Sequence, residues 1–194
     1  MSRADTFGVI LAGGLSRRMG GGDKPLSMLG GRPMLAHVIE RLAPQCAGLA
    51  INANGDPARF EGFGLPVWPD SVGGRPGPLA GILAAMESSP LPWIVTVTGD
   101  APFLPPDLVA RLHAARARLA FASSAGRGHP PIGLWPRALA PALREAVLGG
   151  ERRVGEWALA QGAASVEWDA GPRDPFFNAN TPEELAEAAR LLLS

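Results

Sequence analysis

The stretch GVILAGGLSRRMGGGDKPL (residues 8–26) joins an apolar run to a glycine-rich, basic loop. The run Phe7–Ala12 is continuous rather than alternating, which predicts a strand buried on both faces, as in parallel sheets covered by helices. Residues 13–31 then separate this strand from the next helical pattern, although such connections are typically about 2–6 residues long. A loop of that length inside a compact domain is usually functional.

Short apolar runs alternate with helical patterns along the rest of the chain. Further strands are expected at 48–52, 65–68, 93–98, 119–123 and 132–135. Helices are expected at 33–42, 78–86, 106–119, 137–148, 152–161 and after Thr181, where Thr181, Pro182 and Glu184 form a capping-box pattern. This alternation predicts an α/β fold with a doubly wound, mostly parallel sheet and helices on both faces.

Composition limits the classes of function that the chain can have. The chain has 194 residues and no obvious linker, so residues 1–194 are expected to form one domain. Its 18 Lys and Arg balance 18 Asp and Glu, which argues against nucleic-acid and membrane-surface partners and leaves anion binding to a local cluster. Cys46 is the only cysteine, which excludes an internal disulfide or a cysteine-based zinc site. No stretch approaches the ~18 apolar residues of a membrane span, and we expect a cytoplasmic protein.

The opening loop has the chemistry of an anion site without a common phosphate-loop motif. G-x-x-x-x-G-K-[ST] fails at Lys24, which Pro25 follows, and G-x-G-x-x-G fails after Gly22. Glycine backbone N–H groups can approach phosphate oxygens closely, while Arg17, Arg18 and Lys24 can neutralise a triphosphate. A flexible, solvated turn is the alternative, and spacing alone leaves both open.

Polar side chains follow several expected strands, at the edge where open α/β sheets bind ligands. Asp100 comes after the strand at 93–98 and can hold Mg²⁺, which prefers carboxylate and phosphate oxygens, or it can simply form an Asx turn. Asp70 has the same ambiguity. Asn178 and Asn180 lie near the end of the chain, where Asn180 could merely precede the helix cap.

Histidine and arginine residues outside the loop carry weaker signals. His37 is expected at the core edge, His113 on a solvated helix face, and His129 in a loop, GHPPIG, as a structural or pocket-lining residue. Arg152 and Arg153 lie near an expected helix start, where cations oppose the helix dipole and an anion is favoured. A solvated basic turn explains these two arginines equally well.

The segment LAGGLSRRMGGGDKPL resembles the L-A-G-G-x-S-x-R-M-G-x-x-D-K signature of nucleotidyltransferases, and most closely that of the molybdenum cofactor guanylyltransferases. Later segments resemble this family in the family order: INAN (51–54), PDS (69–71), PGPLAGI (77–82), GDAPFLPPDL (99–108), HPPIGL (129–134), GERRV (150–154) and FFNANTPEEL (176–185). The second glycine of LAGG favours guanine, because related cytidylyltransferases tend to have L-A-A-G. The chain departs from the family at Thr98-Gly99, where cysteine or proline is frequent.

This resemblance implies a Rossmann-like fold that binds GTP in the N-terminal half and molybdopterin in the C-terminal half. It implies Mg²⁺ on Asp100 and nucleotide contacts from Leu11, Ala12, Gly13, Gly14, Lys24, Asn52, Asp70 and Asp100. From their charge we expect Lys24, Asp100 and Arg18 to be catalytic, with Arg17 as the alternative to Arg18 in stabilising the leaving group. The pterin pocket would include Asn178 and Asn180, to which we add Arg152, Arg153 and His129.

The implied reaction transfers GMP from GTP to the terminal phosphate of molybdopterin and releases pyrophosphate. The acceptor itself supplies the nucleophile, so no protein nucleophile is needed. Further implied partners are proteins of molybdenum insertion and molybdoenzyme maturation. The alternatives are a cytidylyltransferase or sugar-phosphate nucleotidyltransferase of the same fold, and a non-catalytic nucleotide-binding protein that delivers cofactor.

Overall fold

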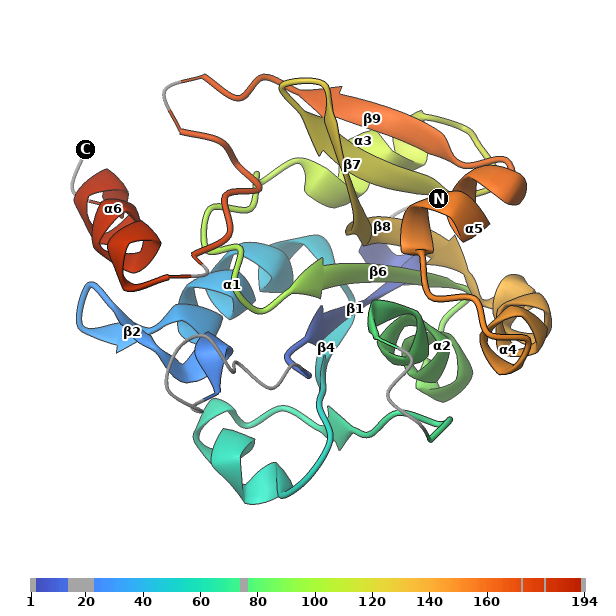
Figure 1. Ribbon diagram of the computed structural model, residues 1–194, viewed down its shortest axis with the longest axis horizontal. Helices are drawn as coiled ribbons and strands as arrows, with labels where there is room; N and C mark the ends of the chain where they lie inside the picture. The colour runs from blue at the N-terminus through green and yellow to red at the C-terminus, as the bar shows by residue number, and fades with distance from the viewer. Residues whose placement is uncertain (1–2, 14–22, 74–76, 172, 180, 193–194) are drawn as a thin grey trace.

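A mostly parallel sheet runs through the molecule (Figure 1). The computed structural model describes residues 3–13, 23–73, 77–171, 173–179 and 181–192. Within them, seven strands form a sheet in the order β5 (Val67–Trp68), β4 (Gly48–Asn52), β1 (Thr6–Leu11), β6 (Trp93–Thr98), β8 (Arg127–Pro136), β7 (Ala120–Ser124) and β9 (Ala164–Trp168). Only β8 runs antiparallel to its neighbours among these strands. The predicted fold class is confirmed.

Helices cover both faces of this sheet. The helices are α1 (Met34–Leu42), α2 (Pro78–Ser88), α3 (Leu108–Ala114), α4 (Ala140–Leu148), α5 (Val154–Ala160) and α6 (Pro182–Leu192). One apolar cluster joins α1 and α3 to Ile10 of β1, and a second joins α2, α4 and α5 to the adjacent Val9. Successive strand residues point to opposite faces, so the continuous apolar run of β1 packs on both layers. Among the described residues, none of the helices has the length and apolar character needed to cross a bilayer.

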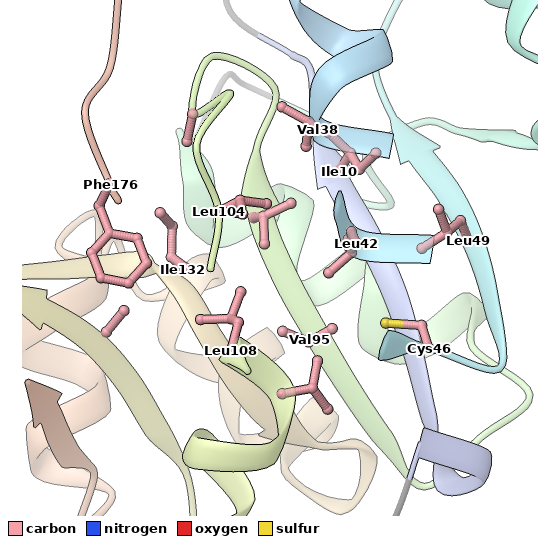
Figure 2. Close-up of a cluster of buried hydrophobic side chains, with 14 of the residues drawn as sticks. Ile10, Val38, Leu42, Cys46, Leu49, Val95, Leu104, Leu108, Ile132 and Phe176 are labelled. Carbon is pink, nitrogen blue, oxygen red and sulfur yellow. The ribbon is translucent and has the colours of Figure 1, made fainter. Parts of the chain in front are cut away.

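The first of these clusters extends across the sheet from β4 to the segment before α6. Figure 2 shows Val38 and Leu42 of α1 near Ile10, with Leu49 and Cys46 at one end of the cluster and Phe176 beside Ile132 at the other. Cys46 is buried and forms no disulfide. The C-terminal segment is therefore anchored in the same core as the first strand.

A third, smaller cluster packs α6 against a hairpin that the sequence patterns did not predict. Strands β2 (Met28–Leu29) and β3 (Arg32–Pro33) pair across Gly30 and Gly31, whose φ angles of 58° and 82° favour glycine. The capping box of α6 is present: the Thr181 N–H donates to Glu184 Oε2 over 3.0 Å, and the Glu184 N–H donates to Thr181 Oγ1 over 3.2 Å. That local prediction is confirmed because its signal lies within one turn of helix.

Several predicted boundaries differ from the observed ones. The helix expected at 106–119 ends at Ala114, because Arg116 adopts a φ of 50° that no α-helix can continue. The strand expected at 132–135 is the antiparallel β8, which starts at Arg127, so His129 lies on a strand rather than in a loop. Strand β9 was not predicted, because its exposed edge position leaves little apolar signal.

The prediction that His113 is solvated was wrong. Its ring is half-buried, Nε2 lies 2.8 Å from Thr6 Oγ1, and the ring packs edge-on against Trp93 with centroids 5.3 Å apart. Burial lowers the pKa of His113 below the usual value of about 6.5, because it disfavours the charged ring. The same cause lowers the pKa of His129.

A lowered histidine pKa predicts destabilisation by acid. Between the usual pKa and the lowered native one, the unfolded chain binds a proton that the folded chain does not, so the free energy of unfolding falls as the pH decreases. We expect the Tm of the wild type to fall more steeply than that of His113→Gln between about pH 7.5 and about pH 5. Thermal melts across this range measure the difference, and parallel curves for the two proteins would contradict the prediction.

Candidate active site

The carboxyl ends of three adjacent parallel strands lie at one level in the sheet. Leu11, the last residue of β1, pairs with Asn52 at the end of β4 and with Thr98 at the end of β6. The alignment continues beyond the strands, because the Gly99 N–H donates to the Leu11 carbonyl over 3.0 Å. This edge is where open α/β sheets bind ligands. The structure therefore brings the ends of β4, β1 and β6 together there.

An ion pair joins the opening loop to the residue that follows β6. The Nζ of Lys24 contacts Oδ2 of Asp100, and the two side chains are only 13% and 19% exposed. The second oxygen of the Asp100 carboxylate, Oδ1, is buried and has no hydrogen-bond partner among the described residues. A buried acceptor without a partner is costly. Among the described residues the Asp100 carboxylate thus lacks one partner, as expected where a cation belongs.

Gly99 allows the loop to approach the sheet this closely. A Cβ at residue 99 would lie 3.0 Å from Cγ of Pro25, the residue after Lys24, and 3.5 Å from the Leu11 carbonyl oxygen. The departure from the family pattern at Thr98-Gly99 therefore has a packing reason. Pro25 fills the space above Gly99 and holds Lys24 next to Asp100.

A second polar network fixes the end of β4 to the segment after β5. Asn52 donates from Nδ2 to the Trp68 carbonyl and to Oδ1 of Asp70, both over 3.0 Å. Asn54 donates to Oδ2 of Asp70 over 2.7 Å and accepts the Asp70 backbone N–H over 2.9 Å. Both oxygens of this carboxylate are engaged, so the predicted residues Asn52 and Asp70 do lie together. Asn54, which was not singled out from the sequence, completes the network.

Helix α2 approaches Asn52 through a glycine. A Cβ at Gly81 would lie 2.3 Å from Oδ1 of Asn52 and 2.9 Å from Cδ2 of Leu11. No side chain fits at residue 81 without moving Asn52. The glycine in PGPLAGI thus has a packing role that fixes the Asn52 amide.

The first residue of the opening loop is hydrogen-bonded to the sheet. The Ala12 N–H donates to the Asn52 carbonyl over 2.9 Å, so Ala12 has no N–H to offer a ligand, and the next candidate donor is Gly13. Gly13 is exposed, and a Cβ there would lie 3.9 Å from its nearest neighbours, an ordinary contact. Among the described residues, nothing therefore requires glycine at residue 13.

The clamp between Arg59 and Asp23 is the feature that sequence reasoning missed. Both Asp23 carboxylate oxygens accept from Nη1 of Arg59 over 2.5 Å, while Nη2 and Nε of Arg59 donate to the carbonyls of Asn54 and Asp56 over 2.6 and 2.9 Å. The clamp holds the residue before Lys24 on the segment that carries the Asp70 network. An available signal was that Lys24 is the only lysine in a chain whose other basic side chains are arginine.

The segment before α6 also reaches the site. Asn178 Oδ1 lies 3.5 Å from Thr98 Oγ1, and the Ala179 N–H donates to the Asp100 carbonyl over 3.4 Å. Asn178 is thus placed near Asp100. Gly14, Arg17, Arg18 and Asn180 lie outside the described residues.

Arg152 and Arg153 contact backbone carbonyls and a glutamate near helices α4 and α5, rather than residues at the carboxyl edge of the sheet. Nη1 of Arg152 donates to the carbonyls of Val147 and Glu151 over 3.1 and 2.7 Å, and Arg153 pairs with Glu156 at 2.5 Å. The helix predicted from residue 152 begins at Val154, so Arg152 faces the C-terminal turn of α4, where a cation is favourable. No hydrogen bond within the described part of the chain connects either arginine to Asp100.

The chemistry at this edge is that of a charged ligand with a metal ion. In the described ranges, no group of three or more His, Cys, Asp or Glu side chains could hold a metal by itself. A cation at Asp100 would therefore take its remaining ligands from water or from a phosphate-bearing molecule, as Mg²⁺ commonly does.

Comparison with known proteins identifies the family. Residues 8–165 match the MobA-like NTP transferase domain. The molybdenum cofactor guanylyltransferase of Rhodopseudomonas palustris (strain BisB5) is 56% identical, with 97% of this chain and 94% of that protein covered. The protein of the same name from Mesorhizobium japonicum is 49% identical, with coverage of 99% and 98%.

Solved structures share the fold. Molybdopterin-guanine dinucleotide biosynthesis protein A from Archaeoglobus fulgidus superposes with a TM-score of 0.73 at 24% identity, covering 97% of this chain and 98% of that one. A 2-C-methyl-D-erythritol 4-phosphate cytidylyltransferase from Thermus thermophilus superposes with a TM-score of 0.69 at 21% identity, covering 96% and 98%.

The Arg59–Asp23 clamp predicts a measurable coupling. In a double-mutant cycle with Arg59→Ala and Asp23→Ala, we expect a coupling free energy of about 1 kcal/mol in urea unfolding, because Nη1 of Arg59 reaches both carboxylate oxygens and the pair is only partly exposed. Arg59→Lys should not restore it, since an ammonium cannot also hold the carbonyls of Asn54 and Asp56 as the guanidinium does. The Arg32–Glu40 pair, whose side chains are 53% and 64% exposed, is the control and should show weaker coupling. Equal coupling free energies in the two pairs would contradict the predicted contribution of the clamp to stability.

Proposed function

The chain belongs to the MobA-like NTP transferase family, and we propose that it transfers GMP from GTP to the terminal phosphate of molybdopterin. The products are pyrophosphate and molybdopterin guanine dinucleotide. The names of the relatives at 56% and 49% identity support this substrate pair. The observation that carries the proposal is the partly buried Lys24–Asp100 pair, in which Oδ1 of Asp100 has no partner among the described residues.

In this proposal residues 1–194 act as one nucleotidyltransferase domain in the cytoplasm, with the nucleotide in the N-terminal half and the pterin in the C-terminal half. The nucleotide contacts are Leu11, Ala12, Gly13, Gly14, Lys24, Asn52, Asp70 and Asp100, and the acceptor contacts are Asn178, Asn180, Arg152, Arg153 and His129. Because the Ala12 N–H is engaged by Asn52, Ala12 would contribute through its carbonyl. Proteins of molybdenum insertion and molybdoenzyme maturation are proposed as further partners.

The substrates make and break the bonds. A terminal phosphate oxygen of molybdopterin attacks the α-phosphorus of GTP as the bond from that phosphorus to the bridging oxygen breaks. Pyrophosphate leaves with the electron pair of the broken bond. Because no protein nucleophile is needed, the chain contributes alignment and neutralisation of charge.

Asp100 fits a Mg²⁺ ion. Its Oδ1 is a buried carboxylate oxygen whose acceptor capacity no described residue uses, and carboxylate oxygen is a preferred ligand of Mg²⁺. When bound, Mg²⁺ supplies positive charge that stabilises phosphate oxygens during the displacement.

We assign stabilisation of the leaving pyrophosphate to Lys24 and Arg18. The ammonium of Lys24 balances Asp100 in this structure, and its backbone is restrained on one side by the Asp23–Arg59 clamp and on the other by Pro25 against Gly99. A cation restrained in this way stabilises developing negative charge with little reorganisation. Arg18 would provide the second cation.

The assignment predicts the behaviour of two variants. Lys24→Ala and Asp100→Asn should each lower kcat at least about 100-fold, because each removes charge that the transition state requires. Pyrophosphate release with GTP, molybdopterin and Mg²⁺ measures this. Arg116→Ala, an exposed change outside the site, is the control. Folded variants with wild-type turnover would show that the mechanism is wrong.

The same assay discriminates the alternatives. Pyrophosphate release with CTP but not GTP would favour a cytidylyltransferase. Nucleotide binding without release under any condition would favour a delivery protein.

A substitution at Gly13 tests whether GTP lies against this residue. Because a Cβ at residue 13 meets only ordinary contacts with the described residues, Gly13→Ala should leave the Tm unchanged but raise KM for GTP about tenfold or more. Gly62→Ala, where the added Cβ has nothing within 4 Å, is the matched control and should change neither quantity. Unaltered KM in the Gly13 variant would place the nucleotide elsewhere.

A further inference from the structure

A chain of hydrogen bonds connects three polar side chains beyond the nucleotide site. Ser124 Oγ at the end of β7 lies 2.9 and 3.0 Å from the two carboxylate oxygens of Asp174, and 2.8 Å from Nε2 of His129. Oδ1 of Asp174 also accepts the Phe176 N–H over 2.8 Å. Ser124 is buried, so its hydroxyl has no competing water contact of consequence. Neither Ser124 nor Asp174 has a role in the proposed transfer.

The chemistry of these groups sets the direction of each hydrogen bond. An ionised carboxylate only accepts, so the Ser124 hydroxyl donates its single hydrogen to Asp174. The same oxygen must then accept from His129, which places the ring hydrogen on Nε2. In the neutral ring, Nδ1 is therefore left with a lone pair and acts as an acceptor.

This acceptor is open to a ligand. The described residues give Nδ1 of His129 no hydrogen-bond partner, and His129 is only half-buried. Aromatic packing supports the His129 ring. His129 packs on Phe176 with centroids 5.1 Å apart, and Phe176 packs edge-on against Trp168. The ring is thus held firmly while one nitrogen remains free.

The cluster lies at the same edge of the sheet as Asp100. Strand β7 runs in the same direction as β6, because both are antiparallel to β8, so Ser124 at the end of β7 lies toward the edge of the sheet where β6 ends, and His129 pairs with Ala122 near that end. The segment 174–179 connects the end of β7 to the residues that follow β6 through polar contacts at its two ends. At one end it holds Asp174 on Ser124, and at the other the Ala179 N–H contacts the Asp100 carbonyl.

We propose that Nδ1 of His129 accepts a hydrogen bond from an N–H group of the pterin ring of the acceptor, and that Ser124 and Asp174 are positioning residues that set the ring's tautomer. The inference rests on the proposed function. A lone-pair acceptor would repel phosphate oxygens, so this group suits the ring end of the acceptor. Pterin rings carry amide and amino N–H donors, which match it.

The charged groups around His129 are Asp174, Glu167 and Arg127, with burial as the largest influence on its pKa, which it lowers. The ring is therefore neutral, and able to accept at Nδ1, near neutral pH. Protonation in acid would convert Nδ1 into a donor and remove the interaction with an N–H group.

An isosteric pair of variants tests the proposal. His129→Leu removes the acceptor, whereas His129→Asn keeps an amide oxygen near the position of Nδ1 and does not titrate. We expect KM for molybdopterin to rise about tenfold in the Leu variant and to stay within about threefold in the Asn variant, with KM for GTP unchanged in both. His113→Gln, a half-buried histidine at the amino ends of the strands, is the control and should leave KM for molybdopterin unchanged.

The pH profile separates recognition from packing. In the wild type, KM for molybdopterin should rise as the pH falls below about 6.5, and this component should be absent in His129→Asn. Comparing the two proteins cancels titration of the acceptor's own phosphate. Ser124→Ala should shift the midpoint of the rise, because the hydroxyl no longer couples His129 to Asp174, whereas lost packing alone would leave the midpoint in place.

The outcomes are distinct. Equal KM values for the Leu and Asn variants, or a Leu variant with wild-type KM, would overturn the assignment of His129. A wild-type protein that transfers no GMP to molybdopterin would instead overturn the proposed function. Circular dichroism of each variant confirms that any loss comes from a folded protein.

Discussion

The common level at which β4, β1 and β6 end is the constraint on which the site depends. Asn52, Leu11 and Thr98 are paired across these strands, so the segments that follow them leave the sheet side by side. The pairing is held because Val9 and Ile10 are fully buried on opposite faces, and a slip of one residue would exchange the two layers of core. The positions of Asp70 and Asp100 follow from this packing.

Of the three carboxylates near this edge, two have their oxygens engaged by described residues and one does not. The Asp70 carboxylate is fully engaged by Asn52 and Asn54, and Asp23 is engaged by Arg59. Asp100, by contrast, retains a buried oxygen without a partner among the described residues. A rigid surround and one open carboxylate oxygen are what a cation site requires, because the surround does not reorganise when the cation arrives.

Local signals were read correctly where a short range of residues controls the structure. The strands at 48–52 and 93–98 have the predicted bounds, and the capping box begins α6 as expected. The errors concern partners distant in sequence. His113 is half-buried because Thr6, 107 residues away, and Trp93 lie against it, and no helical pattern reveals such contacts. Similarly, β8 is antiparallel because it forms a hairpin with β7, which apolar periodicity does not encode.

The sequence by itself determined the fold class, the long loop after β1 and the family signature, because these depend on periodicity and on motifs within one segment. Only the tertiary structure decided which polar groups are partners: Lys24 with Asp100, Asp23 with Arg59, and Asp174 with Ser124 and His129. The physical reason is that hydrogen bonds and ion pairs act over about 3 Å. Separations of 76, 36 and 50 residues become contacts only when the core has packed.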